Sequence, residues 1–328
     1  MKSKRWSKKR KILSAIVAVV LLLLAVPCAV MGPYVLRVQR FEAEPELGYH
    51  APFFVYASPG SRRAAEAGEP VTMLVQPNNS GIPSDDAEVH SKDAWWTAFG
   101  RHGLADELEV VLLVPAFVRP WEDWQIYTHA LDRDVLTTER RDLARVDLQL
   151  LAMVEQARKS LAAEGIRVEE RFLLQGYSAS GMFANRFAVL HPRRVKAVAA
   201  GSPGGWPIAP LARWQDESLP YPIGIADLEE LTGAPFDTEA YAEVPQLLVM
   251  GSLDDNDSVD FRDGWDEEPA ATVDRLFGAT PLDRWDDAEK VYRQAGAQAR
   301  FLLVDGVDHD RRALQEHSTR FFAEILGH

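Results

Sequence analysis

The stretch that most constrains how this chain can fold lies at residues 176–181. A short apolar run leads into Gly176, a serine follows two residues later, and an apolar helical face continues at 182–190. A serine with small neighbours, set between a strand and a helix, is typical of a nucleophile elbow. In such a turn the serine hydroxyl projects outward, and the residues two before and two after it cannot be bulky. The stretch therefore predicts a strand, a sharp turn with a reactive serine, and a helix.

Two serines compete for this role. If Ser178 is the nucleophile, its flanking positions hold Gly176 and Ser180, which are both small. If Ser180 is the nucleophile, Met182 occupies the second flanking position and crowds the turn. These steric limits favour Ser178.

A serine nucleophile needs a histidine base and an acid that orients it. Two later apolar runs end in suitable residues. The run at 246–250 is followed by Asp254, and the run at 300–304 is followed by His309. Serine, acid and histidine thus arrive in an order that resembles the chain order of the α/β-hydrolase arrangement. This coincidence strengthens the interpretation of Ser178 as a catalytic residue.

The wider pattern alternates apolar strands with amphipathic helices. Such alternation predicts a mostly parallel sheet with helices on both faces, with the site at the carboxyl ends of the strands. Residues 62–70 are expected to form a polar loop, and residues 202–243 a cap-like insertion rich in Pro, Gly and Trp. The expected strands are 53–57, 71–76, 109–114, 171–176, 195–200, 246–250 and 300–304, and the expected helices are 92–106 after an N-cap at Ser91, 143–161, 182–190, 283–295 and 311–326.

From about residue 50 to its end, the chain resembles an α/β-hydrolase. Within that superfamily it is most similar to bacterial secreted esterases related to polyhydroxyalkanoate depolymerases and to feruloyl or acetylxylan esterases. The resemblance implies a triad of Ser178, Asp254 and His309. Asp255 and Asp257 stand in the same loop, so the acid can also be one of these.

The resemblance further implies an oxyanion hole and a reaction. Its backbone donors would be Ala179, directly after the nucleophile, and Asn78 or Asn79 in the loop after the strand at 71–76. The expected activity is hydrolysis of carboxylic esters, small or polymeric, through an acyl-enzyme on Ser178. A serine peptidase of the same fold and a catalytically silent binding protein are the alternatives.

The N-terminal segment points to a membrane. Residues 1–11 are basic, and residues 12–31 form an apolar run long enough to span a bilayer. We expect a single-pass anchor with the catalytic domain outside the cell, or a secreted protein if the segment is a cleaved signal. Residues 32–50 are expected to be a tether, and residues 51–328 the catalytic domain.

Charge and cysteine content exclude several classes of protein. The net charge is −13, and the seven basic residues before residue 12 leave −20 for the rest, which argues against a nucleic-acid partner. The single cysteine, Cys28, permits no intrachain disulfide and no cysteine metal cluster. The acidic run at 254–257 lacks the glycine and glutamate of a calcium loop. We therefore expect no metal and no cofactor.

Other residues have a structural and a functional interpretation. His129 follows a strand and can contact substrate, although a buried hydrogen-bonded histidine is the simpler expectation. An apolar acyl pocket or ordinary packing would account for four tryptophans, namely Trp121, Trp124, Trp206 and Trp265.

Overall fold

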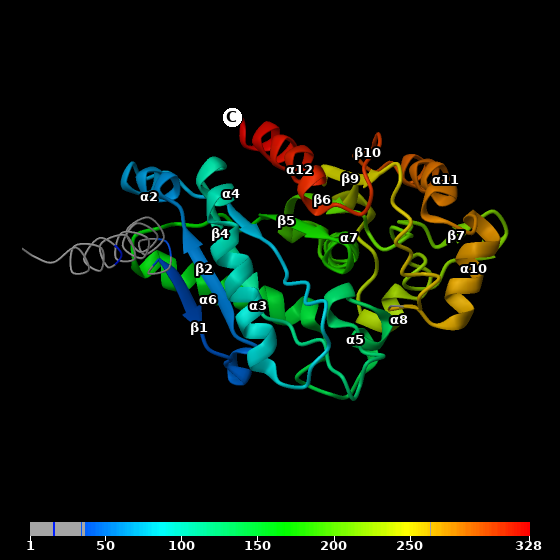
Figure 1. Cartoon of the computed structure of the whole chain (residues 1–328), viewed down its shortest axis with the longest axis horizontal. Coiled ribbons are helices and arrows are strands. Elements are labelled where there is room, and N and C mark those ends of the chain that lie inside the picture. The colour runs from blue at the N-terminus through cyan, green and yellow to red at the C-terminus, as the bar shows by residue number, and fades with distance from the viewer. Residues whose placement is uncertain (1–15, 17–33, 35–36, 263) are drawn as a thin grey trace, which may run out of the picture.

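A computed structural model describes residue 16, residue 34 and residues 37–328 except residue 263. An eight-stranded sheet runs through it in the order β1-β2-β4-β3-β5-β6-β9-β10 (Figure 1). The pairs β1–β2 and β2–β4 are antiparallel, and every later pair is parallel. The mostly parallel sheet predicted from the sequence is therefore confirmed.

The strands form where the sequence is continuously apolar, because helices cover both faces of the sheet. All residues of β2, β3, β4 and β9 are buried. The bounds are β1 Val38–Phe41, β2 Phe53–Ala57, β3 Met73–Val75, β4 Val111–Pro115, β5 Phe172–Tyr177, β6 Val195–Gly201, β9 Gln246–Gly251 and β10 Ala299–Val304, with β7 Arg213–Trp214 and β8 Glu217–Ser218 in a separate hairpin.

Two layers of helices enclose the sheet. One apolar cluster joins it to α3 Ala87–Gly100, α4 His102–Glu107 and α12 Arg311–Leu326. On the opposite face, a larger cluster holds α6 Val146–Ala163 and α7 Ala179–Leu190. The remaining helices are α2 Pro59–Glu66, α5 Arg133–Thr137, α8 Leu228–Thr232, α9 Thr238–Ala242, α10 Glu267–Phe277 and α11 Pro281–Gln294, with short 3-10 turns η1 Pro45–Leu47, η2 Thr128–Ala130 and η3 Pro192–Arg194.

Three sequence expectations are wrong at the N-terminal side of the fold. Residues 62–70 are not a loop, because Ser58 caps α2 through a hydrogen bond from Ser61 N, and Pro59 occupies its first position. The helix expected at 92–106 is two helices: Asp86, rather than Ser91, caps the first, and it ends at Gly100. Residues 32–50 are not wholly a tether, because β1 pairs with β2 along the sheet edge.

The long connection between β6 and β9 is the predicted insertion at 202–243. It carries the β7–β8 hairpin, α8 and α9 in place of a simple crossover helix. Its Trp206 and Leu219 pack with residues of α10 and α11 in a small separate apolar cluster. Helix α10, which was not predicted from the sequence, completes that cluster with Ala270, Val273 and Phe277.

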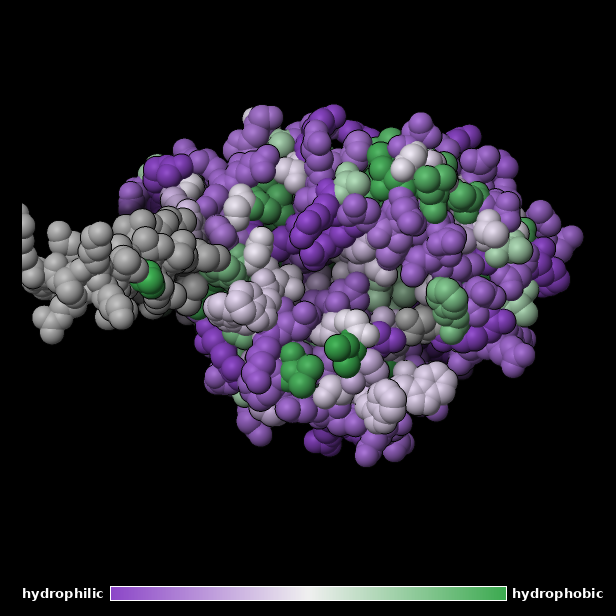
Figure 2. All heavy atoms as spheres, viewed as in Figure 1, coloured by the Kyte–Doolittle hydropathy of each residue, from purple (hydrophilic) through white to green (hydrophobic). Residues whose placement is uncertain are grey.

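The predicted anchor at 12–31 lies outside the described residues, apart from Ile16. Among the helices that the structure describes, none combines the length and the apolarity needed to cross a bilayer. The visible surface is predominantly hydrophilic, with scattered apolar patches (Figure 2). This agrees with the acidic composition of the chain.

Candidate active site

Ser178 occupies a strained turn between β5 and α7. Its backbone has φ 57° and ψ −125°, outside the conformations that serine ordinarily adopts. A Cβ on Gly176 would lie 1.7 Å from the carbonyl oxygen of Ser180, and one on Gly181 would lie 2.5 Å from that of Gly201. The turn is therefore closed by backbone packed against backbone, as the flanking small residues suggested.

Ser180 braces this turn. Its Oγ accepts a hydrogen bond from Tyr177 N and lies 3.0 Å from Tyr177 O, to which it can donate. Its side chain is buried, whereas Ser178 is half-buried. Ser178 N donates to Gly201 O at 2.9 Å, which ties the elbow to β6. Of the two candidate serines, Ser178 is thus the one with an accessible side chain.

His309 and Asp254 meet beside the sheet edge. His309 Nδ1 lies 3.0 Å from both carboxylate oxygens of Asp254. Parallel strands β9 and β10 end side by side, and a Cβ on Gly251 would lie 2.1 Å from Val307 O. The two turns that carry the acid and the histidine are therefore in direct backbone contact. With Nδ1 facing the carboxylate, Nε2 is left to act on a substrate proton.

The structure distinguishes the three aspartates that the sequence left open. Asp254 is 1% exposed and contacts the histidine. Asp257 instead forms a buried ion pair with Arg284, with oxygens 2.8 and 2.9 Å from Nη1. Asp255 is exposed. The geometry brings Asp254 alone of the three to His309.

A tyrosine links this pair to the serine. The Tyr177 and His309 rings lie 4.7 Å apart between centroids at 45°. Tyr177 directly precedes Ser178, so this contact holds the imidazole at the elbow. This role could not be predicted from the sequence, because an aromatic residue within the motif has no fixed meaning.

Asp254 remains ionised despite its burial. Burial raises the pKa of this carboxyl. The hydrogen bond and charge of His309, together with a 3.1 Å hydrogen bond from Asn256 N, lower the pKa by more than burial raises it. The net effect is a pKa below the usual value for aspartate. A charged Asp254 can hold the imidazole in the tautomer with hydrogen on Nδ1.

The loop after β3 reaches the elbow through two asparagines. Asn79 Nδ2 donates to Tyr177 O at 3.0 Å. The buried Asn78 side chain pairs with Phe117, donating to its carbonyl and accepting from its N–H, each at 2.9 Å. Among the hydrogen bonds of the described residues, none is donated by the backbone N–H of Asn79 or Ala179. Both are free to meet a negatively charged oxygen.

Several other candidates are structural. His129 is fully buried, and its Nε2 lies 2.8 Å from Phe117 O behind the Asn78 loop. Burial lowers the pKa of this imidazole to about 3, so it is neutral. Trp206 and Trp265 are buried, whereas Trp121 and Trp124 are exposed. Among the described residues, no cluster of His, Cys, Asp or Glu has the arrangement of a metal site.

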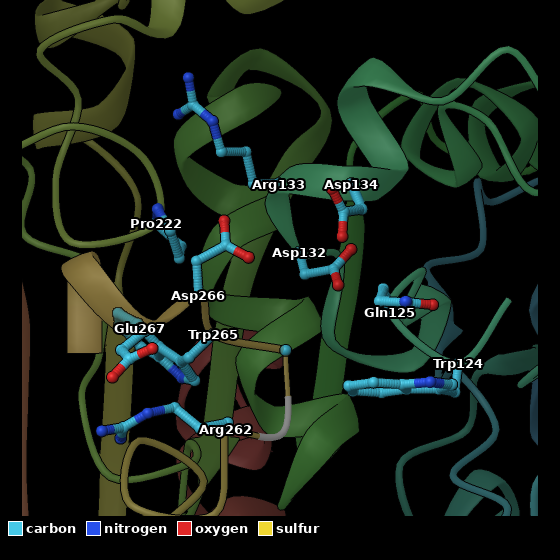
Figure 3. A pocket seen from close by; sticks show the side chains of 11 residues that line it. Trp124, Gln125, Asp132, Arg133, Asp134, Pro222, Arg262, Trp265, Asp266 and Glu267 are labelled. Atoms are coloured by element: carbon cyan, nitrogen blue, oxygen red, sulfur yellow. The ribbon is translucent and has the colours of Figure 1, made fainter.

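A cavity of about 450 Å³ opens between the beginning of α5 and the segment that leads into α10. Asp132 and Asp134 lie on one side of it, and Asp266 and Glu267 lie on the other, with Trp124 at one end (Figure 3). Tyr127 and Ala130 pack against Ala179 and separate this cavity from the start of α7. We refer to it as the acidic pocket.

No family model matches the sequence, and no curated protein matches it. Solved structures that match over most of both chains include two hydrolases. Poly(aspartic acid) hydrolase-1 from Sphingomonas sp. KT-1 has a TM-score of 0.56 and 18% identity, with 86% of this chain and 97% of that chain covered. A poly(3-hydroxybutyrate) depolymerase from Bordetella parapertussis has a TM-score of 0.54 and 18% identity, covering 88% and 89%. The fold is that of the α/β-hydrolases. The resemblance stated from the sequence is thereby confirmed at the level of the fold.

Proposed function

We propose that this protein hydrolyses carboxylic esters through an acyl-enzyme on Ser178. The observation that carries the proposal is the contact of His309 Nδ1 with the buried Asp254 carboxylate, in an imidazole that also packs on Tyr177, the residue directly before a serine held at φ 57°. A strained serine, an oriented imidazole and an ionised acid are the three parts of a serine-hydrolase site. The α/β-hydrolase fold supports the assignment because it commonly carries such sites.

The reaction follows from these positions. Ser178 Oγ attacks the ester carbonyl carbon while His309 Nε2 takes the hydroxyl proton. The same proton is then given to the departing alkoxide, which leaves as an alcohol while Ser178 stays acylated. Water, deprotonated by His309, attacks the acyl carbon. His309 then returns that proton to Ser178 Oγ as the acid is released. Asp254 stays ionised throughout and stabilises the imidazolium.

The oxyanion of each tetrahedral intermediate needs donors that are already in place. We assign this role to the backbone N–H groups of Ala179 and Asn79. Ala179 is the first residue of α7, where the helix leaves its N–H groups without internal partners. The Asn79 side chain holds its loop against Tyr177. A single donor of this kind is worth about 3–4 kcal/mol of barrier.

The test is turnover of p-nitrophenyl esters of graded acyl length by the purified chain and by Ser178→Ala. We expect Ser178→Ala to lower kcat by about 10⁶-fold, because nucleophile and base act as a unit. Ser180→Ala is the matched variant. It removes a hydroxyl that only braces the turn, so a loss of kcat nearer tenfold is expected, equivalent to about 1.4 kcal/mol.

A fluorophosphonate probe gives an independent readout. It should label wild-type Ser178 and leave Ser178→Ala unlabelled. Ester turnover that survives Ser178→Ala would refute the elbow assignment. Absence of both labelling and turnover in the wild type would favour the silent binding protein, and faster cleavage of peptides than of esters would favour the peptidase.

A further inference from the structure

A second cavity lies between α3 and the beginning of α12. Its volume is about 500 Å³, and three arginines line it: Arg101, Arg311 and Arg312. Strongly hydrophilic atoms cover the region where α12 begins (Figure 2). We refer to this cavity as the basic pocket. It stands out in a chain whose residues after the N-terminal tail carry a charge of −20.

The positive charge of this pocket is not neutralised within the described part of the chain. None of the ion pairs there involves Arg101, Arg311 or Arg312. Asp93 also lines the pocket and accepts a hydrogen bond from Ser80 Oγ at 2.9 Å, so three guanidiniums face a single carboxylate and the lining keeps a net positive charge. Asp310 is occupied as the N-cap of α12, accepting from the backbone N–H groups of Arg312 and Ala313.

Arg101 is held in place by an uncharged partner. Its Nη1 donates to Gln315 Oε1, and Gln175 Nε2 on β5 donates to the same oxygen at 3.1 Å. Burial and the nearby charge of Arg311 lower the pKa of Arg101 to about 10, so the guanidinium is still charged at neutral pH. A fixed guanidinium without a counter-ion is preorganised for an anion.

Two of the arginines lie at a helix end that disfavours cations. Arg311 and Arg312 occupy the first turn of α12, at the positive end of the helix dipole. The Asp310 carboxylate caps this end and offsets part of the dipole. An anion bound between the arginines would therefore be stabilised mainly by their own charges.

The basic pocket borders the catalytic residues. Arg311 follows His309 by two residues in the turn after β10. A narrow crevice that also contains Gly176 and Tyr177 shares Arg101, Arg311 and Gln315 with the pocket. On the other side, Ser80 connects Asp93 to the loop that carries Asn79. The pocket is thus joined to both sides of the Ser178 turn.

We propose that the basic pocket binds an anionic group, a carboxylate or phosphate, carried by the ester substrate. This inference rests on the proposed ester hydrolysis and names a class of substrate for it. A planar guanidinium can donate two parallel N–H hydrogen bonds to two oxygens of such a group at once. The exposed indole of Trp96, which also lines the pocket, offers apolar contact to the chain linking that group to the ester.

The test compares p-nitrophenyl butyrate with the mono-p-nitrophenyl ester of glutaric acid, which carries a free carboxylate. Both are assayed with the full-length wild type and with the double variant Arg311→Gln/Arg312→Gln. We expect the ratio of kcat/KM for the anionic ester to that for the neutral ester to fall about tenfold to a hundredfold in the double variant, mainly through KM.

Arg320→Gln is the matched control. Arg320 lies on the same helix and pairs with Glu316 on the surface instead of lining the pocket, and its replacement removes one positive charge where the double variant removes two. The ratio should stay at its wild-type value in this variant. An equal ratio in the wild type, the double variant and the control would overturn the subsite, and an equal fall in both variants would assign the effect to overall charge and overturn it as well.

A binding experiment separates the subsite from the proposed reaction. Inorganic phosphate is titrated by calorimetry into the wild type and the double variant. If the wild type cleaves neither ester, the proposed hydrolysis fails, and the titration then decides the subsite alone. Phosphate binding lost in the double variant supports the subsite, and binding equal in both proteins overturns it.

Discussion

The acidic and basic pockets have similar volumes and lie near the same elbow, yet they handle charge in opposite ways. In the acidic pocket, burial raises the pKa of Asp132 to about 7 and also raises that of Asp134, so these carboxyls can take up protons. Its Arg133 is paired with Asp227. The arginines of the basic pocket are not neutralised in either of these ways. A guanidinium does not lose its proton near neutral pH, and these three form no ion pair within the described residues. Burial thus favours the neutral form of Asp132 in one pocket, whereas the arginines of the other pocket keep their charge.

The buried carboxyls show the same distinction at the level of single residues. Within the described part of the chain, Asp132, the N-cap of α5, accepts hydrogen bonds only from the backbone N–H groups of Tyr127 and Val135. Asp254 contacts an imidazole that can become a cation. Burial is the largest influence on both carboxyls, and the partner decides which of them stays charged.

The largest expected effect concerns the proposed catalytic residues, on which both ester substrates depend. Asp254→Asn removes the charge that fixes the imidazole, and we expect kcat to fall about 10⁴-fold. The anionic and the neutral ester should lose activity equally, since both need His309. Steady-state kinetics with the two p-nitrophenyl esters checks this. A strong change in their ratio would mean that Asp254 acts on substrate charge instead of on the base.

A smaller effect concerns Asp132 in the acidic pocket. The raised pKa of Asp132 means that the folded protein holds this proton at pH values where the unfolded chain has lost it. Wild-type stability should therefore fall, relative to Asp132→Asn, as the pH rises from about 5 to about 8. The expected loss is about 2–3 kcal/mol, measured by urea unfolding at each pH.

Asp237 is the matched control for that experiment, since it is also an N-cap aspartate. Its pKa is lowered by the hydrogen bond from Ala240 N and by Arg193, so its contribution to stability is present at neutral pH and is lost as the pH falls. Asp237→Asn should thus shift the pH dependence in the opposite direction. A common direction for both variants would refute the distinction between the two caps.

The smallest expected effect tests whether the two pockets are independent. Asp134→Asn/Glu267→Gln removes two acidic groups from the acidic pocket. We expect the anionic-to-neutral ester ratio to change by less than about twofold, because charges beyond a Debye length are screened. A rise comparable in size to the fall in the arginine variant would show that substrate preference follows bulk charge, and the contrast between the pockets would be lost.

The strands and the order of Ser178, Asp254 and His309 could be predicted because apolar runs and chain order are local properties of the sequence. The choice among Asp254, Asp255 and Asp257 could not, since it depends on how the acid loop packs against Arg284. Helix α2 was missed because Ser58-Pro59 begins a helix as readily as it closes a turn. Strand β1 was missed because a short, half-exposed edge strand lacks alternation.

The basic pocket could not be predicted from the sequence, for a different reason. Arg101 and Arg311 are far apart in the chain and meet only because α3 and α12 cover the same face of the sheet. Each arginine alone is an ordinary surface residue. The three arginines indicate an anion site because none of them forms an ion pair with a carboxylate within the described chain. This can be seen only once the fold is known.

The backbone contact between Gly251 and Val307 has a consequence for protein engineering. It joins the acid turn to the histidine turn upstream of the long segment that leads from Asp254 to α10. Loops of new length or sequence could be grafted into that segment to alter the walls of the acidic pocket, while the joint keeps the acid aligned with its base. A bulky residue at position 251 would have the reverse outcome, because it would separate the two turns and leave the loops intact.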